Sequence, residues 1–158
     1  MTTAPGAKVS NIAVVKDKVQ RILVDDMELD VRLISEGYQV RFESTAVNIR
    51  VFEQGEGDSA RVLIKMWAPV VRNVGESPEL FRWIATEGTS YLFGNACWNP
   101  DPNRPGFGMV SFDYALLGDY LDGPELRGAL AAVAVTADEL DDELQQKFGG
   151  QRFVDADS

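Results

Sequence analysis

The chain has 158 residues, 45% of them hydrophobic, and this length and composition fit one domain with a single core. Its formal net charge of −10 disfavours nucleic acid and anionic membranes as partners, because phosphate binding needs clustered Lys and Arg, whereas a basic partner, or solubility alone, suits the charge better. The absence of histidine excludes Ser-His-Asp triads, Cys-His pairs and histidine-ligated zinc.

The start of the chain has no pattern typical of a targeting signal. The stretch MTTAPGAKVSN lacks the charged start and the apolar run of a signal peptide, and no later window reaches the roughly 18 apolar residues of a membrane span. We therefore expect a cytoplasmic protein. We also expect a disordered lead at residues 1–8, a single domain at 9–150 and a frayed tail at 151–158.

The first predicted element is a helix over about residues 10–25, because apolar residues recur on one of its sides at helical spacing. These residues are Ile12, Val15, Val19, Ile22 and Leu23. Residues 27–33 then alternate between apolar and polar. This alternation predicts a half-buried strand, although the segment also suits a prolonged helix.

Three further runs alternate with a period of two, at residues 38–42, 47–51 and 62–67. Short spacers separate them, which indicates strands joined as antiparallel hairpins. Trp67 falls on the less apolar face of the last run. Pro69 has no amide to donate, so we expect it to end this ladder or to lie at a sheet edge.

A second helix is predicted to begin after Ser77, which is suited to cap it. Pro78 and Glu79 follow in positions that favour a helix start. Strands are then expected at residues 90–98 and 107–117, separated by the turn-rich stretch NPDPNRPG.

The last predicted helix has the most regular pattern in the chain. Asp122 and Glu125 have the spacing of a capping box at its start, and Gly149 and Gly150 supply a C-terminal cap. Its apolar positions form a narrow stripe: Leu126, Leu130, Val133, Ala137, Leu140, Leu144 and Phe148. The stripe predicts docking on the sheet, although its spacing also suits a coiled-coil seam or a homodimer contact. The acids within 138–143 are then expected to face solvent, except Asp141, which borders the apolar stripe.

Together these elements predict an α+β domain, with an antiparallel sheet of about five or six strands and three helices. The expected order is a helix, three or four strands, a helix, two strands and a helix. The strands come in runs instead of alternating singly with helices, which is typical of an antiparallel sheet.

No motif selects a catalytic, cofactor or metal site. The glycines of QGEGDS and RPGFG precede no helix, so neither is a phosphate loop, and no glycine bend interrupts DELDDE as a calcium loop requires. Cys97 is the only cysteine, which predicts an inert buried thiol. Carboxylates remain available for acid–base catalysis, but no spacing selects a pair. We expect a non-enzymatic protein with no catalytic residue, cofactor or metal.

Large aromatic residues are the candidates for contact with a partner. Trp67 lies on the less apolar face of its strand, and Trp83 lies at the rim of the apolar side of the second helix, which includes Phe81. Partly exposed aromatic rings suit binding, so we select Trp67, Phe81 and Trp83 as partner-binding residues. Core packing is the alternative role for each.

The sequence resembles the small secretion-chaperone-like fold shared by type III secretion chaperones and the YbjN-type family, which includes actinobacterial sensory transduction regulator-like proteins. The resemblance is carried by APVVRNV at 68–74, SPELFRWI at 77–84, YLFGNACW at 91–98 and the run from LLGDYLDGPELRGAL to FGG at 116–150. It implies a non-enzymatic domain that binds peptide or protein segments, often as a dimer, and it supplies no catalytic residue or cofactor.

Two functions from different classes follow. The first is a module that captures an extended segment of a protein or peptide, of basic character, by strand addition or by burial of apolar side chains against sheet and helix. The alternative is a regulatory or sensory domain that binds a small apolar ligand between sheet and helices. An enclosed cavity with convergent polar groups favours the ligand, whereas a solid core beside an exposed apolar groove favours the segment.

Overall fold

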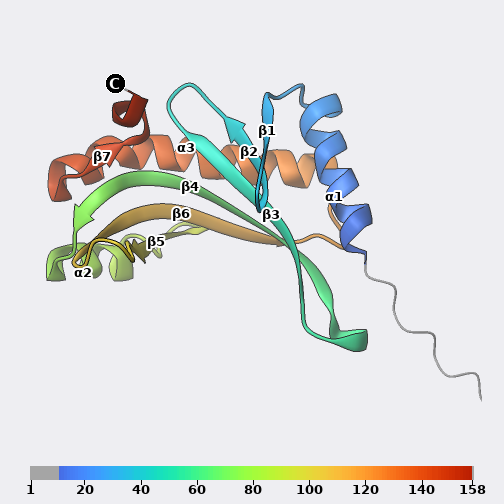
Figure 1. Ribbon diagram of the computed structural model, residues 1–158, viewed down its shortest axis with the longest axis horizontal. Coiled ribbons are helices and arrows are strands. Elements are labelled where there is room, and N and C mark those ends of the chain that lie inside the picture. The colour runs from blue at the N-terminus through green and yellow to red at the C-terminus, as the bar shows by residue number, and fades with distance from the viewer. Residues whose placement is uncertain (1–10, 158) are drawn as a thin grey trace, which may run out of the picture.

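The computed structural model describes residues 11–157, so the lead expected at 1–8 lies outside the described residues (Figure 1). The described part contains three α-helices and seven strands, in the order α1, β1 to β4, α2, β5, β6, α3 and β7. Their bounds are α1 (Ile12–Arg21), β1 (Val31–Ile34), β2 (Gly37–Arg41), β3 (Ala46–Gln54), β4 (Arg61–Gly75), α2 (Pro78–Thr86), β5 (Asn95–Pro100), β6 (Phe107–Leu117), α3 (Gly123–Phe148) and β7 (Gln151–Arg152). The predicted α+β class is confirmed, and so is the order of elements up to α3, whereas β7 is one strand more than the five or six expected.

The strands form one antiparallel sheet in the order β1-β2-β3-β4-β6-β5. The long strand β4 lies at its centre and continues to Gly75, beyond Pro69, which does not end the ladder as expected. The register between β4 and β6 shifts between Pro69 and Val71 and again between Val71 and Val74. Such bulges accommodate a residue without an amide inside a strand.

The core lies between one face of this sheet and the helices. Residues of β3 and β4 that alternate onto that face are buried: Val47, Ile49, Val51, Val62, Ile64 and Met66. Helix α3 runs along the sheet (Figure 1), and its stripe from Leu126 to Leu144 is buried against it. Burying each such Leu or Val stabilises the fold by about 1.5–3 kcal/mol. The expected docking of the stripe is therefore observed, and it leaves no coiled-coil seam on that side.

The N-terminal helix is prolonged by one π-helical turn, Ile22–Asp26, before the first strand begins at Val31. Residues 27–33 were expected to form one strand, but Glu28 has a left-handed backbone with φ of 52°. That conformation interrupts both a helix and a strand. Met27 and Leu29 still pack against the core, which accounts for their place in the alternating pattern.

Both later helices begin at the predicted caps. The hydroxyl of Ser77 accepts the Leu80 amide at 3.2 Å, and the carboxylate of Asp122 accepts the Glu125 amide at 2.8 Å. The strand expected at 90–98 is shorter, because Gly94 has a φ of +87° just before β5 begins. Residues 87–94 consequently form a loop that leads from α2 to β5.

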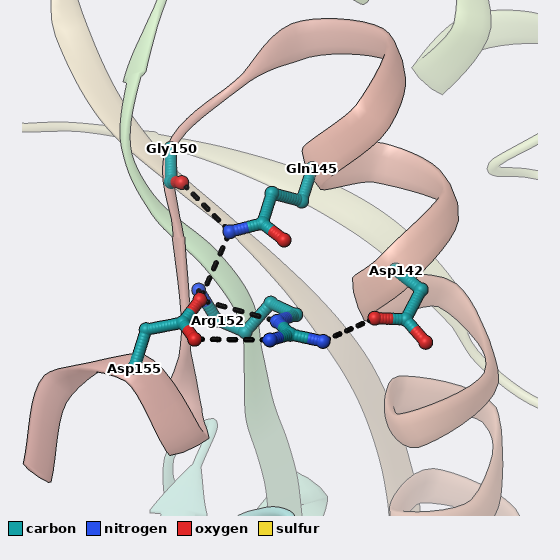
Figure 2. Close-up of polar contacts among 5 residues, drawn as sticks. All are labelled: Asp142, Gln145, Gly150, Arg152 and Asp155. Atoms are coloured by element: carbon teal, nitrogen blue, oxygen red, sulfur yellow. Dashed lines mark hydrogen bonds and ion pairs between the residues drawn. The ribbon is translucent and has the colours of Figure 1, made fainter. Parts of the chain in front are cut away.

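The C-terminal segment, expected to be frayed, folds back as β7 and a 3-10 turn (Figure 2). Arg152 forms two side-chain hydrogen bonds with Asp155, at 3.1 and 3.0 Å, and a further one with Asp142 of α3. Gln145 donates to Asp155 at 2.9 Å and to the Gly150 carbonyl at 3.3 Å. We call this set of five residues the C-terminal clasp. Its bonds reach back to α3, so the local composition of the tail does not reveal them.

Candidate functional site

Strand β6 has a free edge near its end. Strand β5 pairs with β6 only up to the Asn95–Asp113 position, whereas β6 continues to Leu117. Residues 114–117 therefore have β4 on one side and, within the described part of the chain, no strand on the other. The outward-pointing N–H and C=O groups of these residues offer a template for another strand.

An apolar groove of about 360 Å³ lies directly beside this edge, on the helix-covered side of the sheet. Its walls come from loop 87–94, from β6 and from the first half of α3. The lining residues are Phe93, Tyr114, Pro124, Glu125, Gly128, Ala129 and Ala132. The ring of Phe93 meets the ring of Tyr114 edge to face, with 6.1 Å between the centroids.

The groove exists because one flank of α3 carries small side chains. Gly128 and Ala132 are four residues apart and so lie on the same side of the helix. A side-chain Cβ added at Gly128 would meet no atom within 4 Å, so the space in front of it is empty. Larger residues at these positions would close the gap between α3 and Phe93.

Exposed apolar side chains lie next to this gap and at the end of the free edge. Leu92 is 95% exposed and Phe93 56% exposed in loop 87–94. At the end of β6, Leu117 is 49% exposed on the opposite side of the sheet, and Tyr120 beyond the strand is 79% exposed. Soluble domains seldom gather large apolar side chains in one area of surface unless it binds something. The cluster therefore marks the groove and the free edge as one candidate binding site.

The rim of the groove is acidic. Glu125 lines the groove itself. Burial raises the pKa of Tyr91, and the carboxylates of Glu143, Glu139 and Glu87 raise it further. Glu139 and Glu143 of α3 and Glu87 after α2 therefore lie near Tyr91 in loop 87–94. Among them Glu143 is paired with Lys147 at 2.7 Å.

The three aromatic residues selected from the sequence do not form one site. Trp67 is half-buried on the face of the sheet away from the helices. Phe81 is 41% exposed and packs against Trp98, with centroids 5.6 Å apart. Trp83 is 6% exposed and contacts Phe148 at the end of α3. Trp83 therefore packs within the core.

Sequence reasoning missed the residues of the groove. Phe93 stood inside an expected strand, so its exposure on a loop was not foreseen. The small residues Gly128 and Ala132 carry no chemical signature of their own. One usable signal was present, since glycine and alanine recur on a single flank of the last helix beside its apolar stripe.

A larger hollow of about 520 Å³ lies between α1 and the β1–β2 hairpin. Its wall mixes Lys16, Glu36 and Arg50 with apolar side chains such as Leu33. The described residues contain no group of three or more acidic or cysteine side chains placed to hold a metal ion. Between residues 11 and 157, no helix combines the length and apolar character needed to cross a membrane.

The fold and the groove define a class of protein: a small α+β domain with a free strand edge beside an apolar groove. Residues 11–156 match the family described as T3SS (YopN, CesT) and YbjN peptide-binding chaperone 1, TY-Chap1. The chain belongs to this family of peptide-binding chaperones, which confirms the resemblance drawn from the sequence. No curated protein matches the chain.

Proposed function

We propose that the protein captures an extended segment of a partner by strand addition to residues 114–117 of β6. The observation that carries this proposal is the free edge lying directly beside an apolar groove. In strand addition, main-chain hydrogen bonds supply affinity and pockets for alternate side chains supply specificity. The free edge provides the main-chain hydrogen-bonding groups, and the groove provides a pocket for side chains.

The alternation of β6 fixes where the captured side chains go. Phe112 and Leu116 are buried on the helix-covered side, so Tyr114 between them lies on that side too. Ala115 and Leu117 lie on the opposite side. A segment added beside β6 directs every second side chain into the groove between Phe93 and α3.

The size of the site sets the expected affinity. Four residues of pairing extend about 13 Å, and the groove holds one or two apolar side chains. Each buried side chain contributes about 1.5–3 kcal/mol and each hydrogen bond about 0.5–1.5 kcal/mol before the cost of ordering the segment. We therefore expect a dissociation constant on the order of micromolar.

The acidic rim favours a segment with basic residues next to its apolar ones. Glu125 in the groove, and Glu139 and Glu87 near Tyr91, attract Lys or Arg at short range. Binding of this kind needs no chemical step, so the function is non-enzymatic. The groove is open and lacks several convergent polar groups, which favours a peptide segment over an enclosed small ligand.

The experiment compares two neighbouring alanines of α3. Ala132 lines the groove, whereas Ala131 is exposed one position earlier and points about 100° away around the helix. Decapeptides selected from a random phage-displayed library against the wild-type protein are synthesised and titrated against Ala132→Trp and Ala131→Trp. Circular dichroism establishes that both variants are folded.

We expect the selected peptides to alternate apolar with polar or basic residues. Filling the groove in Ala132→Trp should weaken binding by about tenfold or more, whereas Ala131→Trp should bind like the wild type. Equal binding by Ala132→Trp and wild type, or no selected peptide at all with folded wild-type protein, would refute the proposal.

A further inference from the structure

The sheet face away from the helices is a second surface, separate from the groove. Helix α2 packs on the other face, because Phe81 contacts Trp98, which shares a face with the buried Ala96. No described helix covers the opposite face, which we call the open face. Its central side chains are Asn48, Arg50, Phe52, Leu63, Lys65, Trp67, Asp113 and Leu117.

The open face is basic on an acidic protein. The residues that alternate onto it from β1 to β6 include Arg32, Arg41, Arg50, Arg61 and Lys65, against Asp113 as the one acid among these described strand residues. The whole chain has 25 acidic and 15 basic residues, so the balance is reversed here. Two of these guanidinium groups lie over aromatic rings: that of Arg41 over Phe153, at 5.3 Å from the centroid, and that of Arg50 over Phe52, at 5.4 Å.

Two of these cations stand side by side, and each has one acidic partner: Lys65 pairs with Asp113 at 3.1 Å, and Arg50 lies farther from Glu36. Arg50 lies directly opposite Lys65 in the register of β3 and β4, an arrangement that destabilises a sheet by like-charge repulsion. Arg50 meets Glu36 at 3.9 Å, with the two side chains 50% and 60% exposed, and such an exposed pair contributes little. An anionic group placed between Arg50 and Lys65 would relieve this repulsion.

A hollow of about 200 Å³ opens at this position, with Trp67 in its wall. Its floor is held by a chain of hydrogen bonds: Asn99 donates to the Ser111 hydroxyl at 2.9 Å, and Ser111 donates to Asp113 at 2.5 Å. Asp113 also pairs with Lys65 at 3.1 Å. The floor is therefore fixed before any ligand arrives, and the indole of Trp67 offers an apolar wall beside the cations.

An apolar row lies next to the cationic row. Phe52, Leu63 and Leu117 face one another across β3, β4 and β6. A peptide bound across the open face would therefore contact the cations and, next to them, the apolar side chains. A segment that carries both acidic and apolar residues complements this surface.

We infer that the open face docks an acidic, partly apolar peptide segment of a partner protein, at Arg50, Lys65 and Trp67. A long polyanion such as nucleic acid is opposed by the overall negative charge of the chain. A short acidic segment feels chiefly the nearby cations, because charges farther than about 8 Å are screened at physiological salt. This surface lies on the other side of the sheet from the groove, so the inference does not depend on the proposed function.

The test uses a fluorescent dodecapeptide of Glu, Leu and Ser, and a second peptide with Lys in place of every Glu. Binding is measured by anisotropy for the wild type and for two double variants with the same loss of charge. Arg50→Gln with Lys65→Gln alters the open face, whereas Arg82→Gln with Arg127→Gln removes two exposed cations elsewhere. The indole resonance of Trp67, assigned with Trp67→Phe, reports contact at the hollow.

We expect the Glu peptide to bind the wild type, to shift the Trp67 resonance and to lose about tenfold in affinity only with Arg50→Gln/Lys65→Gln. The Lys peptide should bind at least about tenfold more weakly. Equal losses in both double variants, an unshifted Trp67 resonance, or no binding of the Glu peptide would overturn the inference. So would tighter binding of a thymidine dodecanucleotide, or loss of the Glu peptide in Ala132→Trp.

Discussion

Asp141 is an acidic side chain enclosed by the apolar stripe of α3. It is 7% exposed, while its neighbours Asp138 and Asp142 face solvent. Burial raises the pKa of Asp141, and the charges of Asp142 and Asp138 raise it further, although a backbone hydrogen bond and Arg152 oppose the shift. The ionised carboxylate is thus less favourable in the folded protein than in the unfolded chain.

This raised pKa makes a prediction about stability. When the pKa of an acid is higher in the folded protein than in the unfolded chain, its contribution to stability is fully present below the unfolded pKa of about 3.9. That contribution is lost as the pH rises through the pKa of the folded state. Asp141→Asn should therefore raise the free energy of unfolding at neutral pH, with a gain that shrinks to nearly zero near pH 4. Urea unfolding of the wild type and of Asp141→Asn between pH 4 and 8 measures this gain in the free energy of unfolding. A gain independent of pH, or a loss at neutral pH, would contradict the account.

Single residues also mark the limit of what the sequence predicts. The period of two in β4 placed Trp67 opposite Val62 and Met66, because alternation is a local property of a strand. The helical period placed Trp83 at the rim of α2 but not against Phe148, which is distant in the sequence. Its burial depends on how α2 and α3 meet, and no local pattern contains that contact.

Among the elements, β7 is held by charges more than by apolar contacts. Arg152 holds the pKa of Asp155 down to about 2, so both partners stay ionised except in strong acid. The strand itself pairs only Arg152 with Val71 and Gln151 with Arg72, on the edge of β4 that β3 leaves free. The clasp therefore covers an edge that would otherwise be open to other chains.

Removing the arginine should open this element without unfolding the domain. In Arg152→Ala we expect faster amide hydrogen exchange in residues 150–155 and at the β4 edge of residues 71–72, with little change in Tm, because exposed ion pairs add little to global stability. Lys147→Ala, which removes the exposed pair with Glu143, is the control and should leave this exchange unchanged. Identical exchange in wild type and Arg152→Ala would show that the clasp does not hold β7.

Elements with a strong local signal were predicted well, and those that depend on distant partners were not. The caps at Ser77 and Asp122 and the stripe of α3 follow from residues within a few positions of one another. By contrast, β7 exists through contacts with α3 and β4, and loop 87–94 replaces part of an expected strand. Pairing between remote segments is not encoded in local periodicity.

In the molecule as a whole, the two faces of the sheet differ in charge. The helix-covered side carries the groove with its acidic rim, and the open face carries Arg50 and Lys65. The sequence predicted the antiparallel sheet and the binding class. It did not predict the groove, because loop 87–94, β6 and α3 build it jointly from distant parts of the chain.

Nuclear Overhauser contacts across the new strand pair test strand addition at β6 without relying on a variant. A peptide selected on the wild-type protein, unlabelled, is bound to the isotope-labelled protein. We predict backbone contacts between peptide protons and residues 114–117, together with slowed amide exchange there. Contacts confined to another edge or to the open face, or a peptide bound as a helix, would contradict the account.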